Sequence, residues 1–77
     1  MITAPERTVP RLTLGWRLRM ARAHAGMSTQ QAADALGTAR AVLYRWEADD
    51  RTPRLDIIAR ASDIYGVPLD WLVEGVR

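Results

Sequence analysis

The sequence predicts an all-α fold, a compact arrangement of five short helices. Apolar residues recur at intervals of three and four positions, as they do along one face of a helix. Glycines and prolines separate these stretches at short intervals. No segment alternates apolar and polar residues over more than a few positions, as a half-buried strand would. With 77 residues, the chain has room for one modest core and for no separate catalytic domain.

Residues 1–12 include two prolines and few apolar side chains, so we expect an extended arm there, followed by one domain at residues 13–77. The first helix is expected to begin after Thr13, whose hydroxyl suits an N-cap. It is expected to end at Gly26, which can adopt the left-handed conformation. Its inner face is predicted from residues spaced by four, three and four positions: Leu14, Leu18, Ala21 and Ala25.

Two further helices follow, separated by one glycine. Ser28 and Gln31 form a capping box, so the second helix is expected over residues 29–36. The third is expected over about residues 39–47, with Thr38 or Ala39 at its cap position. Small residues allow the two helices to approach closely: Ala32, Ala33 and Ala35. Helix, glycine turn and helix form the unit that places its second helix in the major groove of DNA, although such hairpins also occur in ordinary bundles.

A fourth helix is expected over about Leu55–Tyr65, ending at Gly66. Its inner face is predicted to contain Leu55, Ile58, Ser62 and Tyr65, with Ile57 and Ile64 as satellites of the core. Pro68 suits a first helical turn, so a short fifth helix is expected over Pro68–Val73.

The charge is distributed unevenly along the chain. Residues 1–45 carry seven arginines against two acids, a net of +5, whereas residues 46–77 carry four arginines against seven acids, a net of −3. A basic half indicates a polyanionic partner. All eleven basic residues are Arg, which suits phosphates and guanine edges. A GC-rich coding sequence explains the absence of Lys equally well, but it does not explain where the arginines stand.

Several classes of function are not expected. The chain has no Cys, so thiolate metal sites are excluded, and His24 without Cys or clustered carboxylates is a poor metal ligand. No cofactor loop and no catalytic arrangement is visible, so an enzyme is not expected. No apolar run approaches the roughly 20 residues that cross a membrane. We expect a protein of the bacterial cytosol, which is the host cytosol if the gene is phage-encoded.

The stretch Leu14–Gly75 resembles the Cro and phage-repressor (Xre-like) helix-turn-helix family. The matching motifs are GMSTQQAA at 26–33, LG at 36–37, LYRWE at 43–47, Pro53, and GVPLDWL at 66–72. Together these motifs are specific, although any one alone would be weak. The resemblance implies a five-helix, lambda-repressor-like domain that binds operator DNA, often as a dimer. The short chain favours a Cro-like protein or compact repressor of phage or prophage origin.

In the family pattern the third helix presents four residues to the bases: Arg40, Ala41, Tyr44 and Arg45. A bidentate contact from Arg40 to guanine would contribute about 1–3 kcal/mol of discrimination, and Ala41 could meet a thymine methyl. The alternative for Arg40 and Arg45 is a solvated helix face. Tyr44 could stack, bind a phosphate or cover the helix end.

Other residues are candidates for binding phosphates: Thr29, Gln30, Arg17, Arg19, Arg51, Thr52 and Arg54. Asp49 and Asp50 would repel a nearby phosphate. Either they point away, or Asp49 caps the helix end in the left-handed conformation. The resemblance also implies an internal ion pair between Arg22 and Glu47.

The leading interpretation is a sequence-specific DNA-binding transcriptional regulator with an operator as its partner. Trp16 and Met20 lie on a face that relatives usually fill with polar residues, which indicates a surface for a protein partner. The alternatives are therefore a protein-interaction module such as an antitoxin, and a non-specific architectural DNA binder. A homodimer through residues 51–55 and 67–71 is a further hypothesis from the resemblance.

Overall fold

The computed structural model describes residues 12–76. Within this range the chain forms five helices and no strand: α1 (Leu14–His24), α2 (Thr29–Leu36), α3 (Arg40–Glu47), α4 (Leu55–Tyr65) and α5 (Leu69–Glu74). The predicted all-α, five-helix fold class is confirmed. The predicted arm lies, apart from Leu12, outside the described residues.

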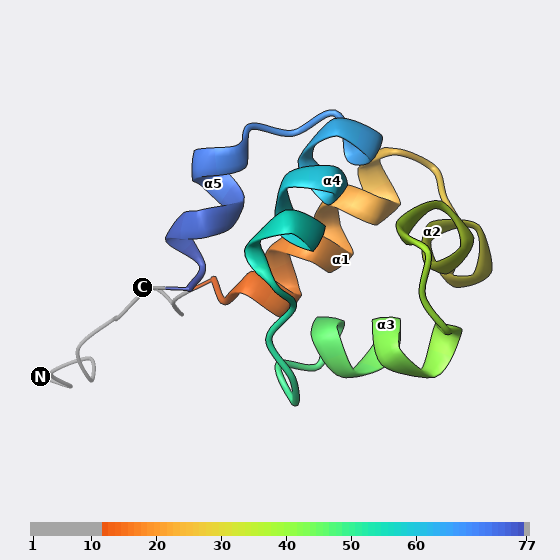
Figure 1. The fold of residues 1–77 in the computed structure, drawn as a ribbon. Helices are drawn as coiled ribbons and strands as arrows, with labels where there is room; N and C mark the ends of the chain where they lie inside the picture. Colours follow the sequence, from red (N-terminus) through yellow and green to blue (C-terminus); the bar gives the residue numbers. More distant parts are fainter. Residues whose placement is uncertain (1–11, 77) are drawn as a thin grey trace, which may run out of the picture.

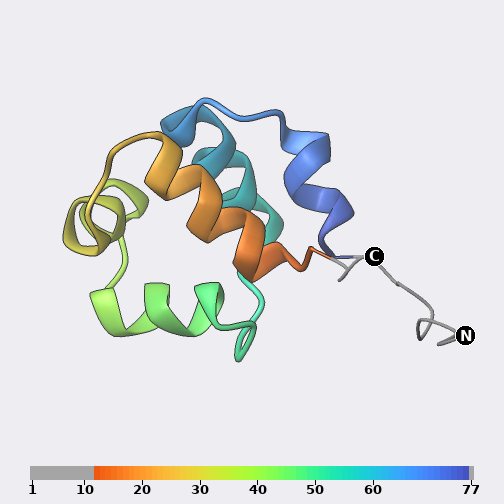
Figure 2. The same cartoon turned by 180° about the vertical axis from the view of Figure 1, so that it is seen from behind.

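Helices α1 and α4 cross the centre of the molecule and contact each other, and α5 packs against both (Figure 1). On the opposite side, α2 contacts α4, and α3 contacts α1 and α2. The view from behind in Figure 2 shows α3 along one edge, away from α5. In Figure 1, α2 is seen nearly end-on and α3 along its length, so the two helices cross steeply. This is the arrangement of a helix-turn-helix unit.

The core consists of apolar residues from all five helices: Leu14, Leu18, Ala21, Ala32, Ala33, Leu36, Leu43, Trp46, Ile58, Ala61, Tyr65 and Leu72. Ile57 and Ile64 are half-buried against this core, as predicted. Leu55 was expected inside but is 64% exposed; the face of α4 that packs on the core begins with Ile57 and Ile58. Ala35 is also exposed, so only Ala32 and Ala33 allow the close approach of α2.

Local capping follows the sequence prediction at α1 and α2. The hydroxyl of Thr13 accepts a hydrogen bond from the backbone N–H of Trp16. At α2, Ser28 accepts from the N–H of Gln31, whose side chain accepts from the N–H of Ser28. Gly37 then ends α2 at φ 69°, in the left-handed region. These bonds fix where α2 begins and ends, and hence where α3 can start.

Of the two cap positions predicted for α3, Ala39 is correct, whereas Thr38 and the placement of Pro68 are wrong. Ala39 is the N-cap of α3, although its methyl side chain forms no capping bond, while Thr38 belongs to the turn that closes the end of α2. The N–H of Thr38 donates to the carbonyl of Ala33 at 2.9 Å, which closes the turn after Gly37. Pro68 precedes α5 as its N-cap in an extended conformation and is not in its first turn.

The two ends of the described segment meet. The N–H of Leu14 donates to the carbonyl of Gly75 at 3.0 Å. A Cβ on Gly75 would lie 2.6 Å from the backbone nitrogen of Leu14, so only glycine allows this contact. Among the described residues, no helix is long and apolar enough to cross a membrane.

Candidate nucleic-acid interface

Helix α3 has an inner and an outer face. Leu43 and Trp46 are buried in the core, and Val42 is half-buried. The four predicted base-reading residues all lie on the exposed side: Arg40, Ala41, Tyr44 and Arg45. The helical spacing thus separated the core residues of α3 from those free to contact a partner.

The last turn of α3 rests directly on the first turn of α1. A Cβ on Gly15 would lie 2.6 Å from the carbonyl oxygens of both Trp46 and Glu47. A real Cβ does not approach backbone oxygens so closely, so glycine is required for this contact. The positive N-terminal end of α1 therefore meets the negative C-terminal end of α3, a favourable dipole arrangement.

An ion pair joins the same two helices. The guanidinium of Arg22 donates from Nε to Glu47 Oε2 at 2.7 Å and from Nη2 to Oε1 at 3.0 Å, which is the pair that the resemblance implies. The two side chains are only 16% and 7% exposed. Arg22 Nη1 also donates to the carbonyl of Met27 in the turn before α2. The hydrogen bond to Glu47 raises the pKa of Arg22 above its usual value.

Asp49 faces α1 and not the outer side of α3. Its backbone has φ 60°, in the left-handed region. Asp49 therefore ends α3 in the left-handed conformation, which is one of the two alternatives that the sequence offered. Its carboxylate accepts hydrogen bonds from the hydroxyl of Thr13 and from the N–H of Gly15, the latter at 2.9 Å. The negative charge of Asp49 is therefore placed against the N-terminus of α1. Asp50 is exposed.

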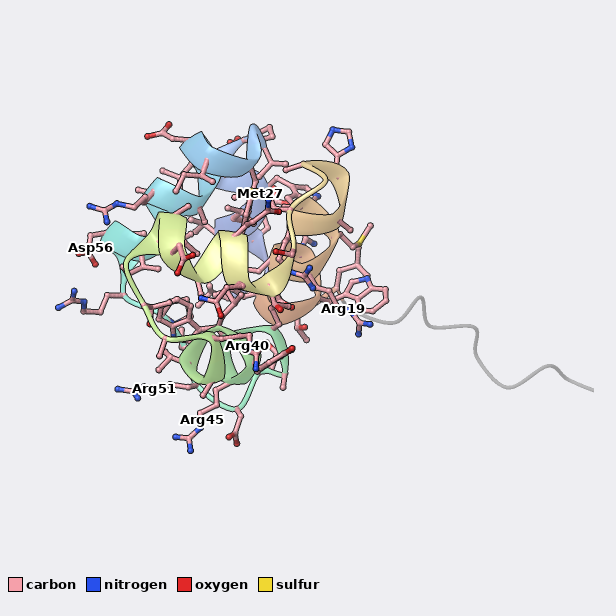
Figure 3. The ribbon with its side chains drawn as sticks, turned by 90° about the vertical axis from the view of Figure 1, so that its right-hand side faces the viewer. Arg19, Met27, Arg40, Arg45, Arg51 and Asp56 are labelled. Carbon is pink, nitrogen blue, oxygen red and sulfur yellow. The ribbon has the colours of Figure 1, made fainter. Side chains whose placement is uncertain are left out.

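Two grooves run along opposite sides of α3. The first has a volume of about 280 Å³ and lies between α1 and α3; its walls are Arg19, Arg22, Tyr44, Glu47 and Ala48. The second, of about 360 Å³, includes on its walls Val42, Trp46, Arg51, Thr52 and Arg54. Figure 3 shows Arg51 to one side of α3 and Arg19 to the other, with Arg40 and Arg45 between them. Helix α3 is thus a ridge with arginines on both flanks.

All the predicted phosphate-binding residues except Arg17 are exposed or partly exposed, with side chains that are available to a partner. Thr29 is half-buried, and its hydroxyl lies 3.4 Å from that of Tyr44. Gln30 is exposed and donates to Asp34 within α2. Arg51 and Thr52 are exposed, and Arg54 makes only an exposed pair with Asp56 at 3.4 Å.

Arg17 is the exception. Its guanidinium donates to the carbonyls of Leu12 and Trp71 at 3.0 and 2.9 Å. It also lies 5.1 Å from the centre of the Trp71 ring and 3.8 Å from Glu74, and its side chain is 13% exposed. The structure therefore uses Arg17 to join α1 to α5. Arg17 is therefore not proposed as a phosphate ligand, because its Nε and Nη1 already donate to carbonyls.

The sequence prediction missed the role of Gly15. A glycine in the first turn of a predicted helix is a signal for a close backbone contact, and it was available. Nothing local indicates the contact of Asp49 with α1, because the two are more than thirty positions apart. Among the described residues, no three side chains of the metal-ligating types come together.

The fold and the exposed ridge of α3 define a helix-turn-helix domain. Comparison with known families agrees: the chain belongs to the family described as "Helix-turn-helix domain", which matches residues 13–73. The chain is also 36% identical over 62 residues to the HTH-type transcriptional regulator ImmR of Bacillus subtilis (strain 168). It is 36% identical over 63 residues to the SPbeta prophage-derived HTH-type transcriptional regulator YonR of the same organism.

These matches cover 80% and 82% of this chain, but 49% of ImmR and 58% of YonR. The chain thus spans about half the length of these relatives. The family resemblance seen in the sequence is confirmed, and the similarity concerns the helix-turn-helix domain.

Proposed function

We propose that this protein binds double-stranded DNA in a sequence-specific way and regulates transcription, as a repressor or Cro-like protein of phage or prophage origin. It acts by binding and not by catalysis. The observation that supports this best is the exposed ridge of α3 between two grooves that each carry arginine. A major groove about 12 Å wide admits one helix between two phosphate strands, so cations on both flanks suit that partner.

Base readout is assigned to the outer face of α3. Arg40 stands in its first turn, where recognition helices come nearest to base edges. A bidentate bond from Arg40 to guanine would supply about 1–3 kcal/mol of discrimination. Ala41 offers a methyl group to thymine, and Arg45 extends from the next turn. Tyr44 shares this face.

Phosphate binding is assigned to residues on both flanks. Arg51, Thr52 and Arg54 follow α3 on one side, and Arg19, Thr29 and Gln30 lie on the other. The N-terminus of α2 adds free N–H groups and a positive dipole end beside Thr29 and Gln30. Neutralising several phosphates makes affinity fall steeply with salt.

We further propose that two copies bind together through residues 51–55 and 67–71. Leu55 and Leu69 are exposed in these segments, and large apolar side chains at a surface favour burial against a partner. The segments lie at opposite ends of α4, so the contact would extend along that helix. Two copies would then contact half-sites about 34 Å apart. The names of the two relatives, which describe transcriptional regulators, support the same function.

The proposal is tested by selecting bound sequences from a random pool of duplex DNA. We expect one enriched site with two related halves and an affinity whose log–log dependence on salt has a slope of several units. Arg40→Ala should flatten the preference at one position in each half-site. Arg60→Ala is the control, because Arg60 is exposed on α4 and its side chain forms no wall of either groove. Absence of any retained DNA at low salt would contradict the proposal, and an unchanged preference in Arg40→Ala would favour non-specific binding.

A second candidate is a protein-interaction module, supported by the exposed Trp16 and Met20 on α1. It predicts a complex whose affinity changes little with salt and is lost in Met20→Ala. The ridge of α3 has no role in that candidate, so we place it second.

A further inference from the structure

The groove between α1 and α3 contains polar groups that base readout does not explain. The hydroxyl of Tyr44 does not extend freely from the outer face of α3. It lies 3.4 Å from the hydroxyl of Thr29, at the first residue of α2. The phenol ring therefore spans from α3 toward α2 along the wall of this groove. Tyr44 thus shares the exposed face of α3 with Arg40 and Arg45, but its hydroxyl lies on the side of that face nearest α2.

Arg19 forms the opposite wall and is oriented by a neighbour. Its guanidinium carbon lies 5.9 Å from the centre of the Trp16 ring, within the range of a cation–π contact. Trp16 is 46% exposed, so the core does not cover its ring, and the guanidinium of Arg19 can stack on it. The backbone at Trp16 is fixed, because its N–H donates to the Thr13 cap and Gly15 rests against α3. Trp16 therefore limits where the guanidinium of Arg19 can lie.

The charges in the groove leave one positive group free. Arg22 and Glu47 neutralise each other through two hydrogen bonds. The carboxylate of Asp49, which follows the wall residue Ala48, accepts hydrogen bonds from Thr13 and Gly15. Arg19 makes no ion pair among the pairs found in residues 12–76. The groove thus combines an unpaired guanidinium with a phenolic hydroxyl, which are the donors that bind a phosphate oxygen.

We propose that this groove binds one phosphate of the DNA backbone, through the guanidinium of Arg19 and the hydroxyl of Tyr44, with Trp16 positioning Arg19. This inference deepens the proposed function and rests on it. It moves Tyr44 from base readout to the backbone. It also gives Trp16 a role in DNA binding in place of the protein-partner surface that its exposure indicates.

Salt dependence and sequence preference together test the proposal. Arg19→Ala should lower the log–log salt slope by about one and weaken binding to all sequences alike. Tyr44→Phe removes only the hydroxyl and should weaken binding about two- to tenfold, with no change in preference at any base. Trp16→Ala should weaken binding about two- to fivefold, and Trp16→Phe, which keeps an aromatic face, should restore most of this loss.

Controls separate this inference from its rivals. Arg60→Ala removes an equal charge from α4 and should leave the slope unchanged apart from a small general effect. Met20→Ala, one turn beyond Trp16, should bind DNA normally. If Met20→Ala and Trp16→Ala instead lose affinity equally for a protein partner, and neither loses affinity for DNA, this face belongs to a protein partner and the inference is overturned.

Two results distinguish the inference from the proposed function. If the unaltered protein binds DNA but Arg19→Ala and Tyr44→Phe bind with the same affinity and slope, the phosphate site is wrong and the function stands. A change of preferred base in Tyr44→Phe would return Tyr44 to base readout. If the unaltered protein binds no DNA, both proposals fail.

Discussion

Removing either partner of the Arg22–Glu47 pair leaves a charge that is almost enclosed by the protein. The side chains are 16% and 7% exposed, so water replaces the lost partner poorly. Breaking a buried pair costs about 3–5 kcal/mol, and the partial exposure of Arg22 places this pair near 3 kcal/mol. A domain of this length has a free energy of unfolding of roughly 4–12 kcal/mol. Arg22→Met or Glu47→Leu alone should therefore remove a large part of the stability.

The double variant Arg22→Met/Glu47→Leu should behave differently. It removes both charges, and apolar replacement of a buried pair is often neutral. It still loses the bond from Arg22 to the carbonyl of Met27, at about 1 kcal/mol. We expect a cost of about 1–2 kcal/mol, well below the sum of the single variants.

Urea denaturation at pH 7, followed by circular dichroism, measures these differences. At about 4–8 °C per kcal/mol, each single variant should also melt roughly 12–24 °C lower. The reasoning fails if the two single losses add up in the double variant, because additivity means that the groups do not interact. A single variant as stable as the original protein would refute it equally.

Two other features give sharp predictions. Alanine usually stabilises an isolated helix, but Gly15→Ala should lower the free energy of unfolding by about 1–3 kcal/mol in urea denaturation, because its Cβ would lie 2.6 Å from two backbone carbonyl oxygens. A gain in stability would show that α1 and α3 are not in close contact. Burial raises the pKa of Tyr65 to about 12 from 10, with a smaller effect from Glu47. The unfolded chain releases this proton first, so the free energy of unfolding should not depend on this group below pH 10 and should fall by up to about 2 kcal/mol as pH rises from 10 to 12. Tyr65→Phe should lack this loss and be at least as stable at pH 7, because the hydroxyl has no hydrogen-bond partner within residues 12–76; an equal alkaline loss in both proteins would contradict this.

The parts of the fold that the sequence predicted well are those determined by near neighbours. The capping box at Ser28 and Gln31 and the left-handed Gly37 each depend on bonds within a few residues. The same is true of the two faces of α3, because helical spacing separates Leu43 and Trp46 from Arg40 and Arg45. Local sequence contains all the information that these features need.

The features that the sequence did not predict depend on contacts between distant segments of the chain. Arg17 and Arg19 look alike in the sequence, yet α5 covers the first and leaves the second exposed. The bond from Arg17 to Trp71 joins residues 54 positions apart, and no spacing rule within the first helix reveals it. Likewise, the sequence offered a left-handed turn at Asp49 as one alternative, but it did not reveal that the carboxylate then accepts from the N–H of Gly15. Tertiary contact, and not residue type, decided both roles.

The contacts that hold α3 in place share no residue with the face that is proposed to read the bases. Its inner side packs through Leu43 and Trp46, and its last turn is held by Gly15 and by the Arg22–Glu47 pair. Substitutions at Arg40, Ala41 and Arg45 therefore leave every one of these contacts intact. It follows that base preference can change while the helix keeps its position, because the side chains that position α3 and those assigned to the bases occupy opposite faces of the same two turns.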